Sequence, residues 1–162
     1  MTALNLGPHF TLDELTASAT AAAHGIDNAP PPAAIANLRR LVDQVLEPVR
    51  AKFGIVRVTS GYRCAALNRL IGGAPGSQHV AGEAADIVCP AIGAGGLAAW
   101  IAHALPFDQL ILEGARAGRS EAPWVHVSVS RHALRGDVLT RRRDGAYARG
   151  LLLINPDGST NG

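Results

Sequence analysis

The chain has 162 residues, a length typical of one domain with its own hydrophobic core, and we expect a single domain over residues 1–162. Hydrophobic residues make up 48% of the chain and charged residues 17%, a composition that excludes an intrinsically disordered protein. The net charge of +2 and the 4% of aromatic residues provide neither a dense basic face nor stacking platforms, so no nucleic-acid partner is expected.

The first third of the chain is predicted to be helical. Thr11 can cap a helix, with Glu14 reaching back three residues later, and Gly25 is a typical stop signal. After the proline-rich loop 28–32, apolar residues recur at helical spacing: Ile35, Leu38, Leu41, Val42, Val45, Leu46 and Val49. Pro48 lies inside this pattern, so the helix is expected to kink or end near it.

The rest of the chain is predicted to contain mostly strands. Strands are expected at 55–59, 85–89, 108–113, 124–130 and 151–154, and helices at 65–70 and 97–105. The strand 124–130 has its valines on one face and leaves His126, Ser128 and Ser130 on the other. Helices come first and no βαβ rhythm follows. We therefore expect an α+β fold with a small, largely antiparallel sheet flanked by helices.

Two of the six histidines are candidates for a metal site. Structural or solvated roles are expected for the other four: His9, His24, His103 and His132. His79 lies in a loop of small residues that runs into a strand, and Gly82 lets the loop fold back so that His79 and Asp86 can converge. Two imidazoles and one carboxylate suit zinc, with a fourth position left for water. The alternative is that Asp86 caps a turn and His126 is a structural strand histidine.

A ten-residue motif and its flanking segments connect these residues to a known family. The pattern S-x-H-x-x-G-x-A-x-D is matched without a mismatch by Ser77, His79, Gly82, Ala84 and Asp86. The segments 59–63, 107–111 and 124–128 follow in the expected order. The chain resembles the zinc D-Ala-D-Ala carboxypeptidases and endolysins, most closely their phage-associated branch, over roughly residues 9 to 130. A Hedgehog/D-Ala-D-Ala-peptidase-like fold is the expectation that follows.

The resemblance implies roles for individual residues. His79, Asp86 and His126 would bind Zn²⁺. Arg63 matches the arginine that faces the substrate carbonyl and can stabilise the oxyanion, although an ion pair beneath the loop is an equally favoured alternative. Ser77 matches a position near the substrate's carboxylate, or only shapes the turn. The variable motif positions, Gln78 and Glu83, are expected to be solvated.

The general base departs from the better-known pattern. Well-known members carry the catalytic carboxylate three residues before the last histidine ligand, where this chain has Pro123. The nearest candidates are Glu113, at the end of the strand 108–113, and Glu121, in the loop before Trp124. The phage-like branch tends to carry a glutamate at the position of Glu113. We therefore predict that Glu113, together with Arg63, is catalytic.

The resemblance implies a zinc metallopeptidase that hydrolyses peptide bonds in the stem peptides of peptidoglycan. It would act as an endolysin-type endopeptidase within the crosslink, or as a carboxypeptidase at a terminal D-Ala. The alternatives are a non-catalytic, zinc-containing module that binds the cell wall, which Pro123 favours, and a phage structural component of the same fold. A monomer is expected.

No signal peptide is visible, because the N-terminal segment has neither a basic start nor an unbroken apolar run, and no stretch reaches the length of a membrane span. The wall would then be reached after lysis or by phage-mediated delivery.

Two further groups are interpreted as bystanders. Cys64 and Cys89 are too few and too far apart for a structural zinc cluster, and two free thiols are favoured over a disulfide. Five arginines lie beyond the resemblance: Arg131, Arg135, Arg141, Arg142 and Arg143. A solvated face or turn is expected for them, with contact to anionic wall polymers as the alternative.

Overall fold

A six-stranded mixed sheet forms the centre of the molecule. The computed structural model describes residues 4–114, 123–142, 144–154 and 160–161. The strand order is β1-β2-β4-β3-β5-β6, and two short strands pair separately as β7 and β8. The strands are β1 Arg57–Ser60, β2 Ala84–Val88, β3 Gln109–Glu113, β4 Trp124–Ser128, β5 Asp137–Arg141, β6 Tyr147–Arg149, β7 Leu153–Ile154 and β8 Thr160–Asn161. The predicted α+β class is confirmed.

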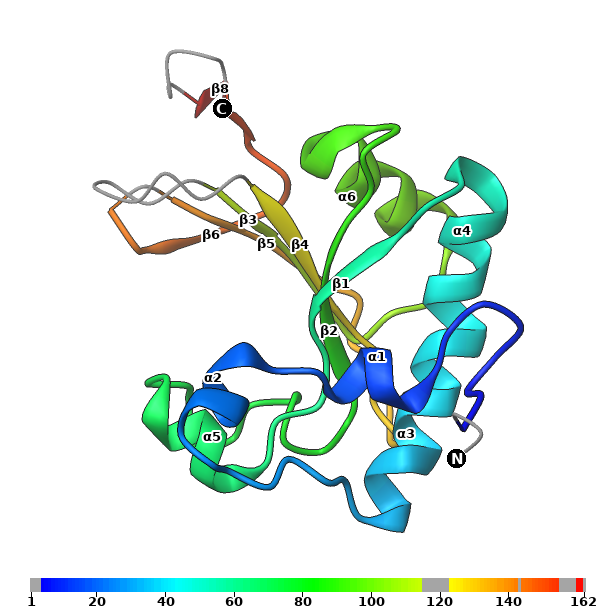
Figure 1. Cartoon of the computed structure of the whole chain (residues 1–162). Coiled ribbons are helices and arrows are strands. Elements are labelled where there is room, and N and C mark those ends of the chain that lie inside the picture. The colour runs from blue at the N-terminus through cyan, green and yellow to red at the C-terminus, as the bar shows by residue number, and fades with distance from the viewer. Residues whose placement is uncertain (1–3, 115–122, 143, 155–159, 162) are drawn as a thin grey trace.

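Helices cover both faces of this sheet. They are α1 Leu12–Thr16, α2 Ala19–Ala23, α3 Pro32–Leu41, the π-helical segment η1 Val42–Leu46, α4 Glu47–Phe53, α5 Ala65–Leu70 and α6 Gly93–Ala104. Figure 1 shows α3, α4 and α6 on one side of the sheet and α2 and α5 on the other. Among the described residues, no helix has the length and apolarity needed to cross a bilayer. Both cysteines are free, and the Sγ atom of Cys64 caps α5.

The predicted first helix is divided in two. Thr11 caps α1 as predicted, its Oγ1 accepting a hydrogen bond from the backbone N–H of Glu14 at 3.2 Å. The chain then leaves the helical conformation because Ser18 starts a second helix, its Oγ accepting from the N–H of Ala21 at 3.1 Å. Gly25, with a φ of 60°, follows the end of α2 as predicted.

The long amphipathic helix passes Pro48 without ending. Its hydrogen-bonding pattern changes to the π type in η1, just before the proline, and α4 then continues to Phe53. Proline lacks an N–H donor, and its ring clashes with the carbonyl four residues earlier. A wider π turn accommodates both effects.

Strand β4 separates an apolar face of the sheet from a polar one, as predicted. Val125, Val127 and Val129 are fully buried. They join a core cluster with apolar residues of the neighbouring strands and of α3, η1, α4 and α6. The side chains that alternate with these valines therefore lie on the opposite, polar face.

The prediction of a largely antiparallel sheet needs one correction. Four of the five pairings are antiparallel, but β5 runs parallel to β3. Neither β5 nor β6 is predicted from the sequence, because Asp137–Arg141 does not alternate cleanly between apolar and polar residues and β6 has three residues. These strands extend the sheet beyond β3 (Figure 1).

The carboxylate of Asp108 holds three segments together. Asp108 is 2% exposed and accepts hydrogen bonds from Nε and Nη2 of Arg135 at 2.9 and 2.7 Å and from Nε2 of Gln78 at 2.7 Å. The hydrogen bonds from Arg135 outweigh burial and lower the pKa of Asp108 to about 2. Gln78 and Arg135, both expected to be solvated, therefore anchor the loop before β2 and the entry to β5.

This anchor predicts a pH dependence. The pKa of Asp108 is lower in the folded chain than in the unfolded chain, where it is near 4. The carboxylate therefore contributes to the free energy of unfolding above pH 4, and this contribution is lost as the pH falls toward 2. Asp108→Asn should lower the free energy of unfolding by about 1–2 kcal/mol at pH 6, with Arg135 partly screened by solvent. The difference from the wild type should shrink toward pH 2.

Urea unfolding at several pH values measures this difference. Asp144→Asn, in an exposed ion pair with Arg142, is the control and should stay within about 0.5 kcal/mol of the wild type throughout. A pH-independent effect of Asp108→Asn would contradict the prediction.

Candidate metal centre

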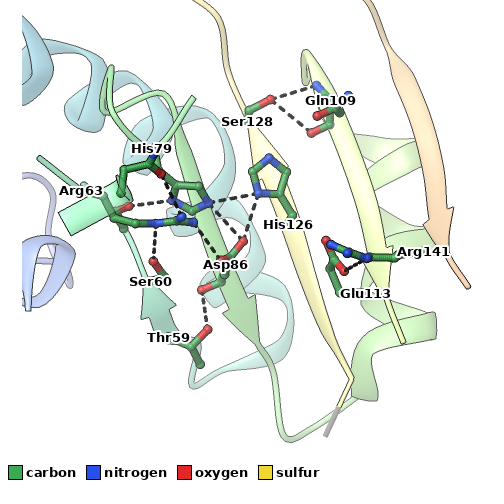
Figure 2. A network of polar contacts seen from close by, with 12 residues as sticks. Thr59, Ser60, Arg63, His79, Asp86, Gln109, Glu113, His126, Ser128 and Arg141 are labelled. Atoms are coloured by element: carbon green, nitrogen blue, oxygen red, sulfur yellow. Dashed lines mark hydrogen bonds and ion pairs between the residues drawn. The ribbon is translucent and has the colours of Figure 1, made fainter. Parts of the chain in front are cut away.

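Three predicted ligands converge from a loop and two neighbouring strands (Figure 2). Asp86 on β2 lies directly opposite His126 on β4, and the loop before β2 brings His79 against both. Nδ1 of His126 lies 3.0 Å from Oδ1 of Asp86, and Nε2 of His79 lies 3.3 Å from the same oxygen. The two histidine nitrogens are 3.2 Å apart. The three atoms form a nearly equilateral triangle.

This triangle fits a tetrahedral metal ion. Zinc binds nitrogen and oxygen at about 2.0–2.1 Å, so neighbouring corners of its tetrahedron are about 3.3 Å apart. Hydrogen bonds alone explain the triangle less well, because Nδ1 of His126 carries at most one proton and lies close to two partners. The donor set of two imidazoles and one carboxylate matches that of zinc sites with an open position.

His79 is oriented by a backbone carbonyl. Its Nδ1 donates to the carbonyl of Gly61 at 2.7 Å, which leaves the lone pair of Nε2 directed at Asp86 and His126. The side chain is 2% exposed, and burial lowers the pKa of His79 against the attraction of Asp86. A neutral imidazole is the form that binds metal.

Asp86 is held as a carboxylate. Burial alone would raise its pKa, but the two histidine side chains beside it outweigh burial, and the pKa of Asp86 lies well below its usual range. Its second oxygen, Oδ2, lies 3.5 Å from Nη2 of Arg63. Asp86 is therefore present as the carboxylate, the form in which it can bind a metal ion.

Arg63 both supports a ligand and lines the cleft. Besides the contact with Asp86, its Nε donates to Oγ of Ser60 at 3.1 Å and its Nη1 to Oδ1 of Asn68 at 3.4 Å. The ion pair beneath the loop, one of its two predicted roles, is thus present. Arg63 also borders a cleft over the polar face of the sheet, where its guanidinium could stabilise an oxyanion of a bound substrate.

Two glycines allow the site segments to approach the helices closely. A Cβ atom at Gly61 would lie 2.2 Å from the carbonyl oxygen of Leu15. Gly82 has a φ of 72°, and a Cβ atom there would lie 2.5 Å from the carbonyl oxygen of Ala34. Gly82 folds the loop back between His79 and Asp86, as predicted.

A cleft of about 640 Å³ opens over the polar face of the sheet. Glu113, Arg141, Ser77 and Trp124 line it together with the three ligand residues. Glu113 lies opposite Trp124, which confirms the predicted pairing of their strands. Its side chain is 9% exposed, and its Oε2 lies 4.0 Å from Nε of Arg141. Glu121, the competing candidate for the general base, lies outside the described residues.

Several polar residues occupy more defined positions than the sequence indicated. Glu83, expected to be solvated, is 7% exposed and accepts a hydrogen bond from the backbone of Arg131. Arg141, assigned to a solvated face or turn, lies on β5 and borders the cleft. Predicting the position of Arg141 would have required predicting β5, and the mixed polarity of Asp137–Arg141 gives no strand signal.

The Peptidase M15 family matches residues 8–128. This range is about three quarters of the chain, and the chain belongs to the Peptidase M15 family. The matched range contains the three ligand residues, Arg63 and Glu113, and it ends with β4, so β5 and β6 lie beyond it. No curated protein sequence matches the chain significantly.

The first prediction from the site concerns metal content. The purified chain should hold one metal ion, and Ala at position 79, 86 or 126 should abolish tight binding, because two ligands cannot retain the ion. Elemental analysis after gel filtration measures this. His103→Ala, on the exposed side of α6, is the control and should keep full occupancy. Full occupancy in His126→Ala would remove His126 from the ligand set.

The second prediction concerns the fold of the loop. Gly82→Ala should destabilise the chain by about 1–2 kcal/mol or more, because alanine disfavours positive φ and its methyl group would meet the backbone of Ala34. Gly76→Ala, with open space around it, should stay within about 0.5 kcal/mol. Thermal unfolding of both variants tests this, and equal melting temperatures would contradict it.

Proposed function

We propose that this chain is a zinc-dependent peptidase that hydrolyses peptide bonds in the stem peptides of peptidoglycan. The observation that carries the proposal is the shared cleft, which Glu113 lines together with His79, Asp86 and His126, called here the metal-binding group. Glu113 lies on the strand next to that of His126. A metal-binding group beside a separate carboxylate is the arrangement that metal-assisted hydrolysis requires.

Zinc is the metal we propose for His79, Asp86 and His126. The spacing of their donor atoms, the oriented tautomer of His79 and the resemblance to zinc carboxypeptidases all support this choice. When bound, zinc supplies a water of lowered pKa and a Lewis acid that polarises the scissile carbonyl.

The chain's own residues perform the proton transfers and stabilise charge. Glu113 accepts a proton from the attacking water at its carboxylate and returns it to the leaving amine. Arg63 donates hydrogen bonds toward the oxyanion that develops on the carbonyl while its contact with Asp86 keeps that ligand in place. Ser77 contacts a carboxylate of the peptide from the rim of the cleft.

Pro123 is the feature that favours the rival interpretations. It is exposed at the position where better-known relatives carry their catalytic carboxylate. A module that only binds the wall, or a structural component of a phage particle, would need no carboxylate in its place. Glu113 supplies one from the adjacent strand, and this supports the enzyme over both alternatives.

The general base provides the decisive substitution. Glu113→Gln keeps the shape of the side chain but removes the proton acceptor. It should reduce the rate of hydrolysis of purified sacculi by about 10²-fold or more while leaving metal content unchanged. Mass spectrometry of the released muropeptides measures the rate and also identifies the bond, within the crosslink or at a terminal D-Ala.

Glu121→Gln is the matched control, because it makes the same chemical change at the competing position. It should retain wild-type turnover. Normal activity in Glu113→Gln, or an inactive Glu121→Gln, would overturn the assignment of the base. If the wild type, loaded with zinc, binds sacculi without releasing muropeptides, the wall-binding interpretation is correct instead.

A further inference from the structure

The hairpin formed by β5 and β6 supplies residues to the cleft from outside the range matched by the family. Arg141 lies opposite Glu113 in the parallel pairing of β3 with β5, and Tyr147 lies opposite Arg141 in the next pairing. Both side chains line the same cleft as the metal-binding group. Glu113, Arg141 and Tyr147 thus form one row across three neighbouring strands.

The guanidinium of Arg141 is held in place but incompletely bonded. Its Nη1 donates to Oη of Tyr147 at 2.9 Å, and its Cζ lies 5.0 Å from the centre of the tyrosine ring. Its Nε is buried and has no hydrogen-bond acceptor among the residues that the structure describes, and it lies 4.0 Å from Oε2 of Glu113. Buried N–H groups are nearly always bonded, so this donor needs an explanation, and an acceptor on a substrate in the cleft would supply one.

The register also fixes how far this cation lies from the metal-binding group. Strand β5 is two strands from β4, about 10 Å at about 4.8 Å per strand, and Arg141 lies two residues beyond the position in line with His126, so the two residues are about 12 Å apart. An extended peptide covers that distance in about four residues. A group carried a few residues from the bond being cut would therefore reach Arg141.

We infer that Arg141 binds a carboxylate of the peptide substrate and so determines specificity, an inference that rests on the proposed function. The planar guanidinium presents paired N–H donors that match the geometry of a carboxylate. Arg141 lies between Glu113 and Tyr147 in its row, so its positive charge offsets the repulsion between Glu113 and an incoming anion. The carboxylate is either the free C-terminus or one carried along the peptide.

Three synthetic peptides test this inference. The first is L-Ala-γ-D-Glu-L-Lys-D-Ala-D-Ala with both carboxylates free, the second is amidated at the C-terminus, and the third at the α-carboxylate of D-Glu. Binding to the metal-loaded chain is followed by stopped-flow fluorescence of Trp124, which lines the cleft, and cleavage by mass spectrometry of the same samples.

The wild type should bind the free acid about 10-fold or more tightly than one of the two amides, and that amide identifies the carboxylate. Arg141→Gln should bind all three peptides with dissociation constants within about 2-fold of one another. Each should be close to the dissociation constant of the wild type for that amide. Arg142→Gln makes the same charge change one residue later on an exposed side chain and should keep the full preference.

Tyr147→Phe provides a second test should circular dichroism show that Arg141→Gln does not fold. It removes only the phenol oxygen that holds Nη1, from a side chain that is 50% exposed, and should reduce the preference for the acid.

Three results would overturn the inference. They are a full preference for the acid in folded Arg141→Gln or in Tyr147→Phe, an equal weakening of acid and amides in Arg141→Gln, and no saturable binding of any peptide by the wild type. Equal weakening would show that Arg141 only holds Glu113. Preference for the acid without cleavage would refute the proposed function alone, whereas cleavage without preference would refute this inference alone.

Discussion

The pairing of Asp86 with His126 across β2 and β4 is the contact from which the rest of the site is built. Strand β4 buries its valines in the core, and because side chains alternate, His126 must face the other way. A shift of one residue in register would bury the histidine and expose the valines, so the hydrophobic core itself fixes the direction of the ligand. His79 then needs only a loop that reaches this pair. The carbonyl of Gly61 sets the orientation of its ring.

Three carboxylates near the cleft each have an arginine partner. The distance between carboxylate and guanidinium differs among the three pairs, and so does the role that each pair can play. Asp108 and Arg135 are joined by short, bidentate hydrogen bonds, which suits an anchor. Asp86 and Arg63 are 3.5 Å apart, and Glu113 and Arg141 are 4.0 Å apart. At these longer distances the arginine attracts the carboxylate without occupying it. In the case of Asp86, its Oδ1 stays directed at the two histidines while Arg63 lies beside its Oδ2.

The sequence predicted the metal-binding group better than the edge of the sheet. His79, Gly82 and Asp86 lie within eight residues of one another, and local loop geometry brings them together. His126 could be placed because the alternation in its strand is strong. The hairpin of β5 and β6 carries no such signal, since its polarity is mixed and its parallel pairing with β3 joins segments that only the complete fold brings together. For the same reason the sequence predicts solvated positions for Arg141 and Arg135. Ser18 likewise divides the first helix through a cap that competes with a continuous alanine-rich pattern.

The boundary of the family match at the end of β4 has an evolutionary consequence. The metal-binding group and Glu113 belong to the segment that the family shares, whereas the hairpin that carries Arg141 and Tyr147 is attached at the outer side of β3. If Arg141 binds the substrate as proposed, changes in this hairpin that keep its contact with Glu113 would alter which peptide is accepted while leaving β2 and β4, which carry Asp86 and His126, in place. Selection can therefore act on the two parts separately.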